Sequence, residues 1–404
     1  MQANREAAPA AAVVIDAGSS TCKAGLASDR APAAVFPTLV GRRLSCHVAA
    51  AAAAVAPDRI DGDGDGDGGG VLVGDAALAR RGALTVARPI ERGAVTNWDD
   101  MEAVWRHAFR TLHVAPEEHP VLLAEPALVP KAARERMTEV MFETFGVPAM
   151  TATMGAVLAL YASGRKTGVV VSAGDGVTST VPIYDGHVLP HAIQRLERLA
   201  GRDVTDRLAA VLAERGYSFA AAAEQHEVVR DIKDKLACVA QEYDDEAGAA
   251  AAGAGAGAES SEVAYELPDG TRITVGSSER FQCAEVLFQP AMLCGMEAAG
   301  SGIHEALFRT INKCDLDMCK FMYANVVLAG GTTLLPGFAE RLGKELVALA
   351  PTGTTVEVVA PPERAYSEWT GGALLASLST FASTLITKAK YDEAGPTVVH
   401  RLRC

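Results

Sequence analysis

The sequence predicts an α/β protein of two or more domains, built around mainly parallel sheets. Short apolar runs that are typical of buried strands alternate with longer stretches of helical periodicity. Two of these runs end in glycine-centred turns, at 16–20 and at 174–177, at corresponding places in the two halves. The 404 residues, 49% of them apolar, suffice for more than one core. We therefore expect a duplicated domain with a ligand between the two copies.

The predicted elements follow from local composition. Strands are expected where short runs rich in valine, isoleucine or leucine occur, at 13–15, 121–123, 169–171 and 326–328. Helices are expected where apolar residues recur with helical spacing, at 101–112, 131–145, 204–215, 226–241 and 336–349. Two low-complexity stretches, at about 43–72 and about 247–260, interrupt this pattern. Such residues bury little apolar surface, so we expect flexible insertions there.

Charge and composition exclude several classes of function. The net charge of −13 and the isoelectric point near 5.2 come without any cluster of lysine and arginine, so direct nucleic-acid binding is not expected. No run of about 18 apolar residues occurs, and residues 1–6 lack the pattern of a signal peptide. We expect a cytoplasmic protein without membrane insertion.

The two glycine turns predict a phosphate-binding site. Asp16 directly follows the first apolar run and is itself followed by Ala-Gly-Ser-Ser. The second run leads into Gly-Asp-Gly-Val at 174–177. A bend after a buried strand presents backbone N–H groups, which can hold nucleotide phosphates. Asp16 is placed to hold a metal ion through its waters, but Ser172 stands where a partner carboxylate would be expected.

The residues around both turns resemble a known family. V-V-I-D-A-G-S-S-T-C-K-A-G at 13–25 and G-D-G-V-T-S-T-V-P-I-Y-D-G at 174–186 closely resemble the phosphate loops of actin. Further similar runs follow in the same order, at 31–42, 96–102, 114–120, 162–165, 265–270, 330–333, 361–364 and 391–393. Because the similarity is collinear from about Val13 to the C-terminus, the chain is identified as a divergent member of the actin family.

This resemblance implies the actin-like two-domain fold, in which two ribonuclease H-like domains enclose a nucleotide cleft. The first domain would comprise 1–155 together with a returning C-terminal segment, 366–404, and the second would comprise 156–365. The insertion at about 43–72 falls where actin carries the loop that reaches into the next filament subunit. Alanine and glycine supply little anchoring area, so we expect impaired or altered polymerisation.

The resemblance also implies a ligand, ATP or ADP with Mg²⁺ or Ca²⁺, and assigns residues to it. Asp16 would approach the metal through water. The phosphates would meet Gly18, Ser19, Lys23, Gly174, Asp175, Gly176 and Val177. The base, the ribose and the third nucleotide loop would involve Arg230, Lys233, Asp234, Gly331 and Thr332. For Arg230, Lys233 and Asp234, a solvated helix face is nearly as good an interpretation.

Several departures from the family affect the chemistry. Ser172 replaces the second metal-side acid, Gly155 replaces the water-positioning glutamine, and Ser179 replaces the histidine near the attacking water. A positioned acid or base is worth roughly 10²- to 10⁴-fold in rate. No catalytic residue is therefore assigned, and hydrolysis is expected to be very slow.

Other replacements lie at the edge of the nucleotide site. Leu335 replaces an aromatic residue and Ala365 replaces a lysine near the base. Ser20 replaces a glycine in the first loop, where we expect a backbone conformation that only glycine adopts at low cost. Together these changes predict weakened nucleotide binding.

The function expected from the sequence is that of a divergent actin-like cytoskeletal protein with weak or absent ATP hydrolysis. Its expected partners are actin or further copies of itself in filaments, together with actin-binding proteins. Two alternatives stay open. One is a functional, ATP-hydrolysing, filament-forming actin, and the other is a nucleotide-free, actin-shaped subunit of a larger complex, for which a nuclear location is also open.

Overall fold

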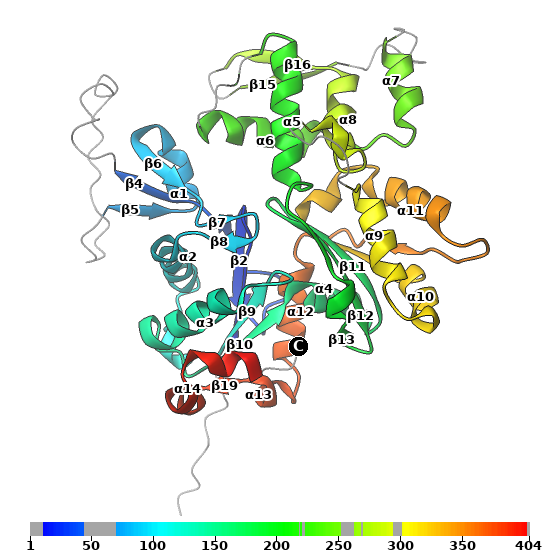
Figure 1. Cartoon of the computed structure of the whole chain (residues 1–404). Coiled ribbons are helices and arrows are strands. Elements are labelled where there is room, and N and C mark those ends of the chain that lie inside the picture. The colour runs from blue at the N-terminus through cyan, green and yellow to red at the C-terminus, as the bar shows by residue number, and fades with distance from the viewer. Residues whose placement is uncertain are drawn as a thin grey trace, which may run out of the picture.

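In a computed structural model, two lobes are built around separate sheets (Figure 1). The structure describes residues 11–43, 70–217, 219, 223–251, 262–267, 270–293 and 301–401. The insertion predicted at about 43–72 lies almost entirely outside the described residues. Within the described ranges, no helix is both long enough and apolar enough to cross a membrane.

The first sheet has the strand order β19-β10-β9-β1-β2-β3. Its strands are β1 (Val13–Ala17), β2 (Thr21–Leu26), β3 (Ala34–Pro37), β9 (Val121–Glu125), β10 (Ala149–Met154) and β19 (Ile386–Thr387). Strands β1, β9 and β10 are parallel, whereas β2 and β3 continue the sheet in antiparallel pairs. The β-branched residues of β1 are fully buried, as their apolar run predicts.

The second sheet repeats this arrangement in the order β13-β12-β11-β17-β18, and β14 also pairs with β12. Its strands are β11 (Gly168–Ala173), β12 (Thr178–Tyr184), β13 (His187–Val188), β14 (Gln194–Leu196), β17 (Val326–Ala329) and β18 (Val358–Val359). Strands β11, β17 and β18 are parallel, and β12 is antiparallel to β11. The two sheets thus share one topology, and the two glycine turns are the β1–β2 and β11–β12 connections.

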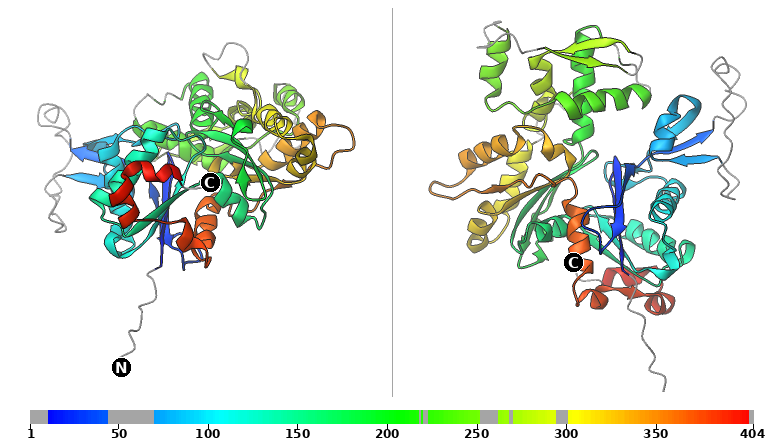
Figure 2. Two further views of the ribbon diagram at one scale, coloured as in Figure 1. Left: turned by 60° about the horizontal axis from the view of Figure 1, so that its bottom comes forward. Right: turned by 180° about the vertical axis from the view of Figure 1, so that it is seen from behind.

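Two helices fill the space between the sheets. Helix α4 (Gly155–Ala162) packs its apolar side chains against the second sheet, and α12 (Ser367–Ala376) packs against the first. The indole Nε1 of Trp369 donates a hydrogen bond to the Val14 carbonyl, at 3.1 Å. Seen from behind in Figure 2, α12 (orange) lies between the two lobes.

The approach of α12 to α4 depends on a glycine. A Cβ at Gly371 would lie 2.8 Å from the Cα of Leu158 and would overlap its carbonyl group. The two helix backbones are therefore in direct contact, and this contact brings the first residues of both helices together.

The remaining elements surround the two sheets. The first lobe adds β4 (Val40–Arg43), β5 (Val71–Val73), β6 (Leu84–Ala87), β7 (Ile90–Glu91), β8 (Ala94–Val95), α1 (Asp75–Ala79), α2 (Trp98–Thr111), α3 (Lys131–Glu139), α13 (Phe381–Thr384) and α14 (Lys388–Ala394). The second lobe adds α5 (Gly201–Glu214), α6 (Ala223–Leu236), α7 (Tyr243–Ala251), α8 (Ser277–Glu285), α9 (Ile303–Asn312), α10 (Leu316–Tyr323), α11 (Phe338–Leu349), β15 (Val263–Glu266) and β16 (Arg272–Val275). The predicted α/β fold is confirmed.

Two boundaries differ from the predictions. The helix expected at 226–241 ends at Leu236, because the amides beyond Ala237 bond to other segments: Cys238 N–H donates to the Arg280 carbonyl and Val239 N–H to the Pro336 carbonyl. The insertion expected from about 247 begins inside α7, which continues to Ala251 because alanine favours helix. Residues 252–260 lie outside the described residues.

Candidate functional site

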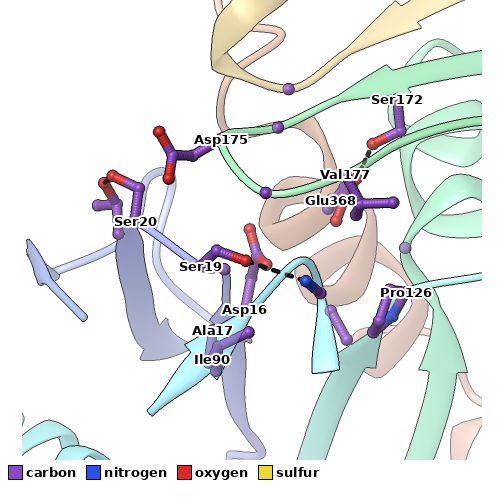
Figure 3. A pocket seen from close by; sticks show the side chains of 18 of the residues that line it. Asp16, Ala17, Ser19, Ser20, Ile90, Pro126, Ser172, Asp175, Val177 and Glu368 are labelled. Atoms are coloured by element: carbon purple, nitrogen blue, oxygen red, sulfur yellow. Dashed lines mark hydrogen bonds between the residues drawn. The ribbon is translucent and has the colours of Figure 1, made fainter. Parts of the chain in front are cut away.

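A cavity of about 690 Å³ lies between the two lobes, a size that suits a small-molecule ligand. Both glycine turns reach it (Figure 3). Every residue that the sequence predicts to bind nucleotide lines this cavity: Asp16, Gly18, Ser19, Lys23, Gly174, Asp175, Gly176, Val177, Arg230, Lys233, Asp234, Gly331 and Thr332. Residues far apart in the chain are thus brought to one place.

The two glycine turns approach each other closely. A Cβ at Gly176 would lie 2.9 Å from the Cβ of Ser19 and would overlap the Ser19 hydroxyl. The Ser19 hydroxyl oxygen in turn accepts a hydrogen bond from the Gly93 amide, at 3.2 Å. Glycine at 176 is therefore needed for this closure of the two lobes.

In the second turn, the carbonyls of Gly174 and Asp175 are bonded to the protein, whereas several backbone amides of the two turns are not. The Gly174 carbonyl accepts hydrogen bonds from the Gly201 amide, at 2.9 Å, and from the Thr332 hydroxyl, at 2.8 Å. Within the described part of the chain, hydrogen-bond partners are absent for the backbone amides of Ser19, Ser20, Asp175, Gly176 and Val177. These groups form an uncompensated set of donors, suited to anionic oxygens.

Asp16 and Lys23 form a buried ion pair at the base of the first turn. They lie opposite each other on β1 and β2, and the Lys23 ammonium donates to Asp16 Oδ2 at 2.7 Å. Burial alone would lower the pKa of Lys23, but the charge and hydrogen bond of Asp16 outweigh it and raise that pKa. The lysine is therefore cationic at neutral pH and holds the Asp16 carboxylate in place.

The residues predicted for the base and ribose lie on α6. Lys233 is buried, and its ammonium lies 3.3 Å from both the Gly201 carbonyl oxygen and Asp234 Oδ1. Asp234 is more than half exposed. Leu335 and Ala365 also line the cavity.

Ser20 differs from the prediction. It was expected to need a backbone conformation that favours glycine, yet it is not among the described non-glycine residues with positive φ. That expectation is wrong, because the turn places Ser20 directly before β2, where an L-residue is accommodated. Its hydroxyl instead accepts a hydrogen bond from the Arg230 guanidinium, which joins the two lobes.

Further ion pairs across the cleft were not predicted from the sequence. Arg92, with φ of 47°, pairs with Asp203 at 3.0 Å. Arg88 pairs with Glu227 and also donates to the Ser19 carbonyl, at 3.2 Å. These contacts join the segment around β7 and β8 to helices α5 and α6 of the second lobe. Nothing in the local sequence pairs these residues.

Ser172, Ser179 and Gly155, the positions predicted to lack catalytic side chains, all line the cavity. Ser172 and Ser179 are directly opposite each other on β11 and β12, and Gly155 begins α4. The space beside Gly155 is filled, because a Cβ there would lie 2.7 Å from Glu368 Cδ.

Glu368 is the site residue that the sequence predictions missed. The Ser172 hydroxyl donates to its Oε1 at 2.7 Å, and the side chain lines the cavity (Figure 3). Burial raises the pKa of Glu368 to about 7 and the negative charge of Asp16 adds to this, whereas Lys23 and the Ser172 hydrogen bond oppose it. A signal was available in the sequence: Glu368 shares the helical face of Gly371 and Gly372, which packs inward.

We predict that Glu368→Gln stabilises the ligand-free protein in a pH-dependent way. A carboxyl whose pKa is raised from 4.5 to about 7 on folding destabilises the fold as it ionises. The gain from glutamine should be near zero below pH 4.5 and should rise to at most about 3 kcal/mol above pH 7. Urea unfolding in EDTA buffer across this range measures it. A gain that is equal at all pH values would contradict the buried, ionising carboxyl.

Comparison with known families agrees with this geometry. A family model described as Actin matches residues 7–404, nearly the whole chain. The match includes both lobes, both glycine turns and the segment that carries Glu368.

Proposed function

Because the chain belongs to the actin family, we propose that it is a divergent actin-like cytoskeletal protein that binds ATP or ADP with a divalent cation between its lobes, with weak or absent hydrolysis. The observation that carries this proposal is the set of unpaired amides on two facing turns, next to the Lys23 ammonium, in one cavity. Amides and a cation in a recess are the donors that a polyphosphate needs.

In this proposal the phosphates lie between the two turns. The amides around Ser19 and those of 175–177 would bind phosphate oxygens from opposite sides, and Lys23 would add a positive charge. Arg230, Lys233, Asp234, Gly331 and Thr332 would surround the ribose and base. Ala365 and Leu335 offer no charged or aromatic contact there, which supports weaker binding than in other family members.

The residues present fit a hydrated divalent cation that arrives with the nucleotide. Asp16 and Glu368 offer carboxylate oxygens, which Mg²⁺ and Ca²⁺ prefer. Among the described residues, no group of three acidic, histidine or cysteine side chains comes together that would hold a metal ion directly. A cation here would therefore draw its other ligands from phosphate and water. When bound, it would neutralise phosphate charge.

Weak hydrolysis follows from the side chains on the wall of the cavity. Ser172 and Ser179 present small hydroxyls, and Gly155 presents no side chain, where the family positions metal and water. Loss of one positioned acid or base costs roughly 10²- to 10⁴-fold.

We also propose that the domains divide as 1–155 with 366–404, and 156–365. The pairing of β19 with β10 and the packing of α12 on the first sheet support the return of the chain to the first domain. Altered self-assembly, partnership with actin and actin-binding proteins, and a cytoskeletal location belong to the same proposal.

A titration with a fluorescent ATP analogue, with and without Mg²⁺, tests nucleotide binding, and a phosphate-release assay tests turnover. We expect saturable binding with very slow phosphate release, because a lost positioned acid or base costs roughly 10²- to 10⁴-fold in rate. Actin-like release during filament pelleting would instead support the ATP-hydrolysing alternative. No binding under either condition would refute the proposal and favour a nucleotide-free subunit.

We predict that Lys23→Met weakens nucleotide binding by roughly 10- to 100-fold, because a hydrogen bond to a charged group contributes about 1.5–3 kcal/mol. The fluorescent titration measures this change. Lys235→Met is the matched control, because Lys235 is exposed on α6 and pairs with Asp231 at 2.6 Å, outside the residues that line the cavity. Equal affinities for the two variants would show that Lys23 does not face the phosphates.

A further inference from the structure

We infer that Glu368 supplies the second carboxylate of the cation site, and holds the metal's water shell together with Asp16. This inference rests on the proposed nucleotide site and assigns one more residue to it. Glu368 comes from α12, a helix separate from the strand position, Ser172, where the family's acid would stand. The carboxylate is therefore relocated to another element rather than lost.

Helix packing delivers the carboxylate to this place. Gly371 lets α12 lie directly on α4, so that Glu368, one turn earlier, reaches the first residue of α4. That residue is Gly155, whose missing side chain leaves the space that the Glu368 carboxylate occupies. A larger residue at either glycine would exclude this arrangement. The glycine at 155 thus provides the space that the carboxylate of Glu368 requires.

The hydrogen bonds leave one carboxylate oxygen available. Oε1 is held by the Ser172 hydroxyl at 2.7 Å, which fixes the side chain. Within the described residues, Oε2 has no hydrogen-bond partner, and the side chain lines the cavity. Ser172 thus orients Glu368 where, in the family, the residue at this position would itself face the metal.

The charge of Glu368 favours a cation as its ligand. The Lys23 ammonium is hydrogen bonded to Asp16, at 2.7 Å. Glu368 forms no ion pair with any basic side chain in the described structure, and its hydrogen bond comes from Ser172. An incoming nucleotide without metal would meet the repulsion of this carboxylate. A divalent cation bound to the phosphates removes that repulsion and supplies water molecules as hydrogen-bond donors to Oε2.

The consequence is a separation of binding from turnover. Glu368 restores an acidic group beside the metal, but Gly155 and Ser179 still provide no glutamine or histidine to position water. The site would therefore bind a metal–nucleotide complex but hydrolyse the nucleotide slowly.

The test compares nucleotide affinity in Mg²⁺ and in EDTA, for the full chain and its variants, with a fluorescent ATP analogue. We define the metal gain as Kd in EDTA divided by Kd in Mg²⁺. Glu368→Gln should lower the metal gain by roughly 10- to 100-fold, the usual effect of an outer-shell metal partner. Its affinity in EDTA should equal or exceed that of the wild type, because repulsion is removed. Glu214→Gln, at the exposed end of α5, carries the same charge change and should leave the gain unaltered.

Two further variants make the test decisive. Ser172→Ala should reduce the metal gain less than Glu368→Gln does, because it frees the carboxylate without removing it. The double variant Ser172→Asp/Glu368→Val returns an acid to the strand and should recover most of the gain. Circular dichroism melting checks that each variant is folded.

The outcomes separate the inference from the proposed function. A wild-type metal gain retained in folded Glu368→Gln overturns the role of Glu368, while nucleotide binding stands. Equal affinity of the wild type in Mg²⁺ and in EDTA would also overturn the role of Glu368 and leave nucleotide binding standing. Absence of binding in both conditions refutes the nucleotide site itself, and the inference with it.

Discussion

A variant that combines Ser172→Asp, Gly155→Gln, Ser179→His and Glu368→Val is expected to release phosphate from ATP about 10²- to 10⁴-fold faster than the wild type. The three positions all line the cavity, and the resemblance to actin predicts an acid, a glutamine and a histidine at these positions in the family. The fourth change is needed because Glu368 occupies the space that a side chain at 155 would take. Single-turnover phosphate release at saturating Mg-ATP measures the effect.

Gly155→Gln alone provides the control for this design. With Glu368 present, its Cβ would lie 2.7 Å from the Glu368 Cδ, so we expect a lower melting temperature and no increase in rate. If the combined variant folds and binds Mg-ATP but releases phosphate no faster, the replaced wall residues are not what limits hydrolysis. A rate increase from Gly155→Gln alone would show that Glu368 moves aside readily.

The second large effect is expected for Gly371→Ala. The added Cβ would lie 2.8 Å from the Leu158 Cα and overlap backbone atoms that cannot rotate away, so α12 and α4 must separate. We expect the free energy of unfolding to fall by about 3 kcal/mol, the upper part of the range for overpacked cores. The shift of α12 also moves Glu368, so the metal gain should fall in the same variant.

Gly343→Ala is the matched control for Gly371→Ala. Gly343 also lies within a helix, α11, but a Cβ there would meet only the Val358 side chain, at 3.5 Å, an ordinary contact. Alanine should stabilise that helix by about 0.5–1 kcal/mol. Urea unfolding of both variants makes the comparison. If Gly371→Ala proved as stable as Gly343→Ala, the direct contact of α12 with α4 would be contradicted.

Much of the fold followed from local sequence. The runs at 13–15, 121–123, 169–171 and 326–328 are rich in β-branched and leucine residues, and each lies within a buried strand. Boundaries were less predictable. Helix α6 ends at Leu236 because the amides of Cys238 and Val239 bond to distant carbonyls, which no local pattern encodes.

The sequence by itself determined the family, the α/β class and the residues of the two glycine turns, because these depend on patterns of neighbouring residues. The tertiary structure alone decided which groups from distant segments meet. Glu368 is 196 residues from Ser172 in the chain, yet they share a hydrogen bond. Their contact depends on the crossing of α12 over α4 at Gly371. Whether two helix backbones can touch depends on the side chains of both helices. The sequence of one helix alone therefore does not specify the contact.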